Sequence, residues 1–265
     1  MKAHQLIHRY DINHWRKYRP FEPQYAKFSP HEILAGFKIE DICMQYGNAR
    51  ASLLCMEVDD YGRLLVTHDK LHFVYIRSKF LFDALANYNY CIDLSWQFLY
   101  LYYGYDDYGI IQDRRRYENE TKECNKESLR YRLVGLAKEQ EKFDYIMAFL
   151  ETPLTKEIRS AYNYIKHRGT YHIEGLGINN SESFPMDFNG KKLRMITRET
   201  IDVDEWKEKL VEFDISFYKY LDKLIKQIMP STFVEGTFYS GDLSKLSREV
   251  EMWYKTSETK EMVKD

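Results

Sequence analysis

Four polar side chains near the end of one predicted helix are the residues of this sequence best suited to chemistry. They fall within roughly a 100° arc of the helix, opposite an apolar face centred on Ile158: Arg159, Asn163, Lys166 and His167. Histidine is the residue type that exchanges a proton near neutral pH. An amide one turn away can orient it or a phosphate, and the two cations can balance developing negative charge. The arrangement is therefore suited to proton transfer beside a phosphate.

The same residues also have an ordinary structural interpretation. Every amphipathic helix has a polar face, and cations in a last turn interact favourably with the negative end of the helix dipole. The polar arc alone leaves both interpretations open.

The helix that must position these residues has clear start and stop signals. Thr152 or Thr155 can cap its first turn, Pro153 ends the preceding segment, and Gly169 is a typical C-terminal cap. Its apolar face recurs at helical spacing through Leu154, Ile158, Ala161, Tyr162 and Ile165. We therefore predict a helix that ends at Gly169 and presents the polar arc in its last turns.

Apolar residues at spacings of three and four predict four further long helices. Their expected ranges are 30–57, 69–103, 126–150 and 202–230, with Ser29 and Asp202 or Asp204 as N-terminal caps. The polar segment 104–125 is interpreted as a connecting loop with a short helical turn. Asn189-Gly190, followed by an extended pattern, predicts a β-hairpin before the last long helix.

These elements predict a mainly α protein with one helical domain. The expected division is a lead-in segment (1–28), a single helical domain (29–230) and a C-terminal tail with a short helix (231–265). Only 12 glycines and 6 prolines occur in 265 residues, which is too few for the many turns of an all-β sandwich.

Charge, hydropathy and cysteine spacing argue against several classes of protein. A net charge of −2 argues against binding nucleic acid by bulk electrostatics, so any nucleic-acid contact must be local. No stretch has the length of a signal peptide or a membrane span, and we expect a cytoplasmic protein without membrane contact. The four cysteines are far apart and are expected to be reduced. His68 and His72 lack a third ligand at matching spacing, so we expect no metal site and no cofactor.

The segment 161–169, Ala-Tyr-Asn-Tyr-Ile-Lys-His-Arg-Gly, resembles the end of the signature helix of HEPN domains. The usual pattern there is Arg, a polar residue that is often Asn, three variable residues and then His. Asn163 and His167 match, whereas Tyr162 occupies the arginine position and Arg159 lies three residues before it. With the tyrosine-rich helix upstream and the hairpin, the resemblance covers roughly residues 70–230. Together with the Lys-His-Arg-Gly ending, these features resemble a branch known from clostridial and bacillar genomes.

The resemblance implies a HEPN-like antiparallel helical bundle with a small β-hairpin insertion before the last long helix. Many HEPN proteins are metal-independent ribonucleases that dimerise through this helix and cleave RNA between the two copies. His167 would then act as general base or acid and Asn163 would position it. Lys166 or Arg159 would hold the phosphate.

Three further residues are expected on the substrate side: Tyr162, Arg168 and Asp93. Asp93 lies in an apolar stretch, where an unpaired carboxylate would be costly. Its partner is either a polar residue of the signature helix (Arg159, Lys166 or His167) or backbone groups and tyrosine hydroxyls.

The resemblance also bears on partners. Some HEPN proteins are toxins or antiviral proteins, and others are inactive partners of nucleotidyltransferases. We therefore expect a homodimer that acts on RNA, with an antitoxin or a nucleotidyltransferase as partner. The alternative is a catalytically inactive helical module that binds a protein through its aromatic surfaces.

Overall fold

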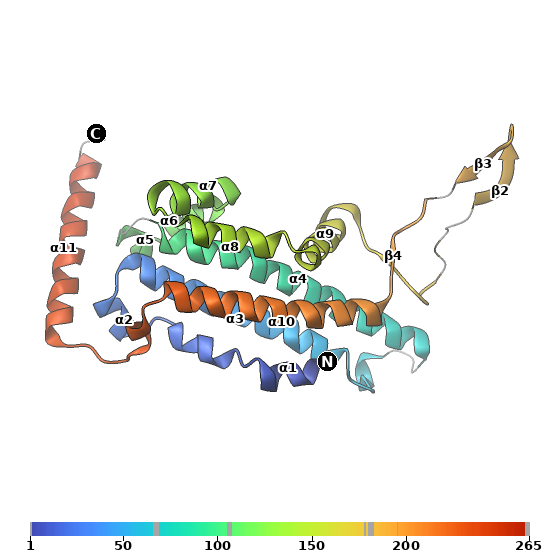
Figure 1. Cartoon of the computed structure of the whole chain (residues 1–265), viewed down its shortest axis with the longest axis horizontal. Helices are drawn as coiled ribbons and strands as arrows, with labels where there is room; N and C mark the ends of the chain where they lie inside the picture. The colour runs from blue at the N-terminus through green and yellow to red at the C-terminus, as the bar shows by residue number, and fades with distance from the viewer. Residues whose placement is uncertain are drawn as a thin grey trace. The chain divides into compact units, whose positions relative to one another are not determined.

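A computed structural model describes residues 2–65, 69–104, 108–177, 179, 183–194 and 196–262; His68 lies outside them. Figure 1 shows the elements in chain order. The α-helices are α1 (Ala3–Arg9), α2 (Glu22–Lys27), α3 (Pro30–Cys55), α4 (Lys70–Tyr102), α5 (Gly109–Gln112), α6 (Arg114–Lys122), α7 (Lys126–Arg130), α8 (Gln140–Leu150), α9 (Pro153–Arg168), α10 (Val203–Ile228) and α11 (Ser240–Met262). Three 3-10 segments, η1 (Asn13–Tyr18), η2 (Gly62–Leu64) and η4 (Ser231–Val234), and the π-helical segment η3 (Tyr131–Leu136) lie between them. The strands are β1 (His172–Ile173), β2 (Ser183–Phe188), β3 (Lys191–Arg194) and β4 (Thr200–Ile201).

The mainly α fold class is confirmed, and α3 and α10 begin directly after predicted caps, Ser29 and Asp202. The Ser29 amide donates to the Glu32 carboxylate over 3.0 Å, as in a capping box. The Glu205 amide donates to Asp202 over 2.7 Å at the start of α10. None of the described helices combines the length and the hydropathy that a membrane span requires.

The predicted hairpin is also confirmed. Strands β2 and β3 pair antiparallel, and both turn residues have positive φ, 54° at Asn189 and 76° at Gly190 (Figure 1). Asparagine and glycine tolerate this backbone region better than other residues do, so the pair selects the turn.

The chain forms two compact units in the described structure. The first contains residues 1–10, 46–89 and 151–217, and the second contains 11–45, 90–150 and 218–265. Helices α3, α4 and α10 therefore each contribute residues to both units. The division into a lead-in, one helical domain and a tail stays a prediction.

A fully buried ion pair lies in the core of the first unit. Arg50 donates to both carboxylate oxygens of Asp214 over 2.8 Å, and the two side chains are 5% and 0% exposed. The Tyr88 hydroxyl also donates to Asp214 over 2.7 Å, and the Tyr46 hydroxyl donates to its carbonyl over 2.6 Å. A third Arg50 nitrogen donates to the Tyr10 carbonyl over 2.6 Å. This network ties α3, α4 and α10 to the residue that follows α1.

The network keeps the Tyr88 hydroxyl protonated and the Arg50 guanidinium charged. Burial, reinforced by the negative charge of Asp214, raises the pKa of Tyr88 well above its usual value, so its hydroxyl remains a donor. Burial alone would lower the pKa of Arg50, but the hydrogen bonds and charge of Asp214 outweigh it and raise this pKa. The pair is therefore a permanent part of the core.

The core of the second unit is largely aromatic and aliphatic. Phe149 stacks on Tyr220 with ring centroids 4.0 Å apart, and the Trp15 indole donates to Asp222 over 3.2 Å. Its completely buried side chains include Trp15, Ile33, Ile39, Ile42, Phe98 and Phe233.

Three segments differ from their predicted structure. The expected single helix over 126–150 is wrong: it is interrupted by η3 and by Lys138, whose φ is 63°. Arg132 causes part of the difference, because its guanidinium is buried, donates to the Tyr100 carbonyl over 2.7 Å and pairs with Glu120. The polar segment 104–125 contains the helices α5 and α6, and the second begins at an Asp113 cap. The tail holds α11, which is longer than the short helix expected there.

Close packing at Gly36 of α3 leads to a first prediction. An added Cβ would lie 2.5 Å from the Tyr18 carbonyl oxygen and 2.9 Å from the Phe233 ring. We expect Gly36→Ala to lower the unfolding free energy by about 1–3 kcal/mol, as overpacking does. Gly47→Ala, in the same helix with nothing within 4 Å of the added Cβ, is the control. It should be neutral or stabilising by up to about 1 kcal/mol. Equal stabilities of the two variants in urea titrations would contradict the packing argument.

Candidate functional site

Helix α9, in the first unit, carries the site residues and has the predicted ends. The Thr152 hydroxyl accepts from the Thr155 amide over 3.4 Å, and Pro153 occupies the first helical position. Gly169 ends the helix with φ at 112°, a value that glycine adopts without a Cβ clash. Lys166, His167 and Arg168 form its last turn, as predicted.

The apolar face of α9 is buried and the opposite face is exposed. Ile158 and Ala161 are 0% and 3% exposed, whereas Asn163 and His167 are both exposed. Residues four apart on a helix are neighbours, so the amide and the imidazole lie beside each other. Neither side chain forms a hydrogen bond or ion pair with another described residue. Both are therefore accessible to a substrate.

One flank of α9 is covered by neighbouring elements of the first unit. Tyr164 stacks on the buried Tyr171, with ring centroids 4.4 Å apart. Lys209 of α10 donates to Glu157 over 2.7 Å. Tyr171 in turn lies 6.5 Å from Trp206, and burial raises the pKa of its hydroxyl to about 12. These contacts fix the rotation of α9 and leave the Asn163–His167 side uncovered.

The exposed face contains two residues that were not among the candidates predicted from the sequence. Lys156 and Ser160 are exposed and, with Asn163 and His167, follow one another at spacings of four, three and four. At about 100° per residue the four fall within roughly 60° of the helix circumference. They therefore form one row along α9. Their spacing was visible in the sequence, but their exposure depends on which flank Tyr171 and Lys209 cover.

The other predicted site residues differ in exposure. Lys166 and Arg168 are exposed beside His167, whereas Arg159 and Tyr162 are half-buried and each has a partner. Asp93 is half-buried in the second unit, so its predicted pairing with α9 stays a prediction. Within that unit it lies near Cys124. Burial raises the pKa of this thiol to about 12, and the Asp93 charge adds to the rise while that of Arg132 opposes it.

The end of α9 thus combines an accessible imidazole, an amide one turn earlier and two flanking cations. Such a set can move a proton at a substrate oxygen while the cations bind an adjacent phosphate. Among the described residues, no group of three or more His, Cys, Asp or Glu side chains is placed to hold a metal ion.

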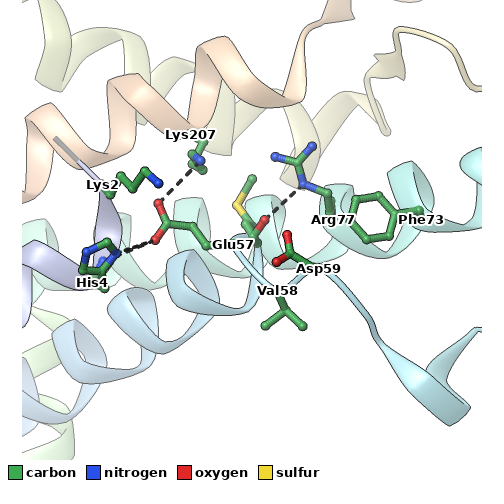
Figure 2. A pocket seen from close by; sticks show the side chains of 9 residues that line it. Lys2, His4, Glu57, Val58, Asp59, Phe73, Arg77 and Lys207 are labelled. Carbon is green, nitrogen blue, oxygen red and sulfur yellow. Dashed lines mark hydrogen bonds and ion pairs between the residues drawn. The ribbon is translucent and has the colours of Figure 1, made fainter.

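A concavity of the first unit lies at the start of α1, and no pattern in the sequence pointed to it. It measures about 420 Å³ and is lined by Lys2, His4, Met56, Glu57, Val58, Asp59, Phe73, Arg77 and Lys207. Figure 2 shows Glu57 between His4 and Lys207, with its oxygens 3.4 Å and 3.6 Å from their nitrogens. Glu57 also accepts from the Ala3 amide over 2.9 Å. Arg77 is bound to the Met56 carbonyl and to Asp204. Most of the cations here are thus engaged by the protein's own acceptors, and Glu57 holds α1 in place.

Glu57 leads to a second prediction, on pH. Burial raises the pKa of Glu57, but hydrogen bonds from the Ala3 and His4 amides outweigh it and bring the net value below the usual 4.5. A depressed carboxyl pKa stabilises the folded state above the unfolded value and loses this effect as pH falls through the folded value. Glu57→Gln should therefore reduce the loss of unfolding free energy between about pH 7 and pH 3.

Urea titrations at both pH values would check this expectation. Glu208→Gln is the control, because Glu208 is an exposed carboxylate of α10 on the adjoining surface. If Glu57→Gln loses as much unfolding free energy between the two pH values as the wild type does, the assignment of Glu57 is contradicted.

No protein-family model, curated protein or solved structure matches this chain.

Proposed function

We propose that this protein is a HEPN-like protein that acts on RNA as a metal-independent endoribonuclease. The observation that carries the proposal is the exposed pair Asn163 and His167, one turn apart on the uncovered side of α9. The resemblance of residues 161–169 to the HEPN signature supports it. In this function two copies of the chain form a homodimer in which both α9 helices border one RNA-binding cleft.

The proposed reaction is an internal transfer at one phosphodiester. The His167 imidazole removes the proton of a ribose 2′-hydroxyl, and that oxygen attacks the adjacent phosphorus. The bond to the 5′-oxygen of the next nucleotide breaks, and this oxygen takes up a proton. The products are a 2′,3′-cyclic phosphate and a 5′-hydroxyl, and no metal takes part.

The neighbouring residues have supporting roles in this proposal. Asn163 positions the imidazole, and Lys166 or Arg159 stabilises the charge on the phosphate. Tyr162, Arg168 and Asp93 are the proposed substrate contacts. Because Tyr162 stands where HEPN ribonucleases have arginine, the exposed cations of the last turn, Lys166 and Arg168, are the proposed replacement.

The proposed biological setting is cytoplasmic, in a toxin–antitoxin or antiviral defence system. An antitoxin or a nucleotidyltransferase would be the protein partner. The support for this setting is the HEPN resemblance, since its members act in such systems.

The product ends test the reaction. The purified full chain, incubated with single-stranded RNA and EDTA, should leave 2′,3′-cyclic phosphate and 5′-hydroxyl ends. Cleavage that stops with EDTA, or products with 3′-hydroxyl ends, would refute the proposed mechanism.

A second candidate function is a non-enzymatic helical interaction module. It is favoured by exposed apolar side chains of the second unit, which lie just before or within α2 and α11: Phe21, Tyr25, Phe238, Tyr239 and Leu243. Four of them line an apolar groove of about 460 Å³. Large apolar patches on a protein surface often mark protein contacts. This function requires no RNA affinity, so RNA binding by the purified protein separates the two candidates.

A further inference from the structure

Asn163 and His167 belong to a longer exposed row of polar residues on α9. Lys156 and Ser160 precede Asn163 and His167 on the same side of the helix, and all four are exposed. The helix rises about 1.5 Å per residue, so the row is about 16 Å long. Stacked nucleic-acid strands carry a phosphate about every 3.4 Å along the axis. The row therefore has the length of about five nucleotides.

Cations lie at both ends of this row, and their interactions with the rest of the protein are weak. At one end, Lys156 pairs with Glu151 over 2.5 Å, but both side chains are more than half exposed. Such exposed pairs contribute little, so a phosphate can replace the carboxylate. Lys166 and Arg168, both exposed, flank the other end, each about 100° around the helix from His167 and on opposite sides of the row. Ser160 and Asn163, between the two ends, supply a neutral hydroxyl and an amide that can donate to phosphate oxygens.

We infer that this row is a binding track for a single strand of RNA, with Lys156 contacting a phosphate several nucleotides from the one that reacts at His167. The inference rests on the proposed function and adds two positioning residues to it, Lys156 and Ser160. Neither touches the reacting atoms. They set the minimum length of RNA that binds well.

Because the contact is remote, Lys156→Gln should affect long and short RNAs differently. We expect the affinity for a ten-nucleotide, non-cleavable 2′-O-methyl RNA to fall about threefold to tenfold. The slope of log affinity against log salt should decrease by about 0.7, the value for one lost phosphate contact in a single strand. For cleavable RNA, KM should rise for the ten-nucleotide substrate with kcat unchanged. Cleavage of a dinucleotide should keep its wild-type kcat/KM.

Two further variants make the test specific. Ser160→Asp places a negative charge in the middle of the row and should weaken ten-nucleotide binding more than Lys156→Gln does. Lys245→Gln is the matched control, since Lys245 is also an exposed helical lysine with a carboxylate partner, Glu249 at 3.8 Å. It should leave affinity and salt slope at wild-type values.

The outcomes separate this inference from the proposed function. If Lys156→Gln and Ser160→Asp match Lys245→Gln while His167→Ala abolishes cleavage, the track is refuted and the nuclease site survives. If the wild-type chain has no affinity for RNA, both are refuted. If Lys156→Gln slows dinucleotide cleavage equally, Lys156 acts on the reacting phosphate and the remote contact is wrong.

Discussion

Asp214→Asn should lower the unfolding free energy by an amount on the order of 3–5 kcal/mol, the usual cost of removing one partner of a buried ion pair. Asp214 is completely buried and accepts hydrogen bonds from Arg50 and Tyr88. An uncharged amide leaves the Arg50 guanidinium buried without a counter-charge. It also cannot accept every bond that the carboxylate accepts. Urea-induced unfolding of the wild type and the variant measures the difference.

The matched control is Asp204→Asn. Asp204 also pairs with an arginine, Arg77, but its side chain is 65% exposed. Arg77 is 15% exposed but also donates to the Met56 carbonyl, so this partly exposed pair contributes less than the buried one and the variant should lose less stability. A double variant, Arg50→Met with Asp214→Leu, should recover part of the Asp214→Asn loss because no unpaired charge remains. Equal losses for Asp214→Asn and Asp204→Asn would contradict the structural role of the buried pair.

The second large effect concerns catalysis. His167→Ala should reduce the single-turnover rate of RNA cleavage by about 10²–10⁴-fold, the usual contribution of general acid–base catalysis. Because the exposed imidazole makes no bond to other described residues, its removal should leave stability at the wild-type value. RNA affinity should change by no more than a few-fold, because the neighbouring cations remain.

His8→Ala is the control for this substitution. His8 is likewise an exposed histidine in the last turn of a helix, α1, and it has no role in the proposed reaction. It should cleave RNA at the wild-type rate. If His167→Ala cleaves as fast as His8→Ala, the imidazole of His167 is not the proton-transfer group.

Local signals in the sequence were sufficient for α9 and the hairpin. Thr152 caps the first turn of α9 through its hydroxyl, whereas Pro153, Gly169 and the Asn189-Gly190 turn act through their own backbone geometry. No distant contact is needed to place these ends. The chemistry-bearing end of α9 was therefore predictable to the residue.

The interruption of the 126–150 segment was not predictable in this way. Its apolar spacing continues through η3, but Arg132 is directed to the carbonyl of Tyr100, 32 residues earlier in the chain. Such a contact depends on the tertiary fold, and it overrides the local helical pattern. The buried partnership of Arg50 and Asp214, 164 residues apart, was missed for the same reason.

For the candidate site, the sequence predicted residue types and the helix face but not the accessible row. Helical spacing places Arg159 in the same polar arc as His167. In the structure Arg159 is half-buried, and Lys156 and Ser160 are exposed beside the pair instead. How far each of these side chains is buried depends on contacts with other parts of the fold, which no helical period encodes.

The most direct test of the account is whether RNA touches His167. The imidazole signals of the full chain can be followed by NMR while a 2′-deoxy-substituted, non-cleavable RNA is added. We predict that the His167 signals shift in a saturable way and that those of His8 stay in place. Saturable RNA binding that leaves the His167 signals unmoved, or no binding at all, would contradict the assignment of this helix face to RNA.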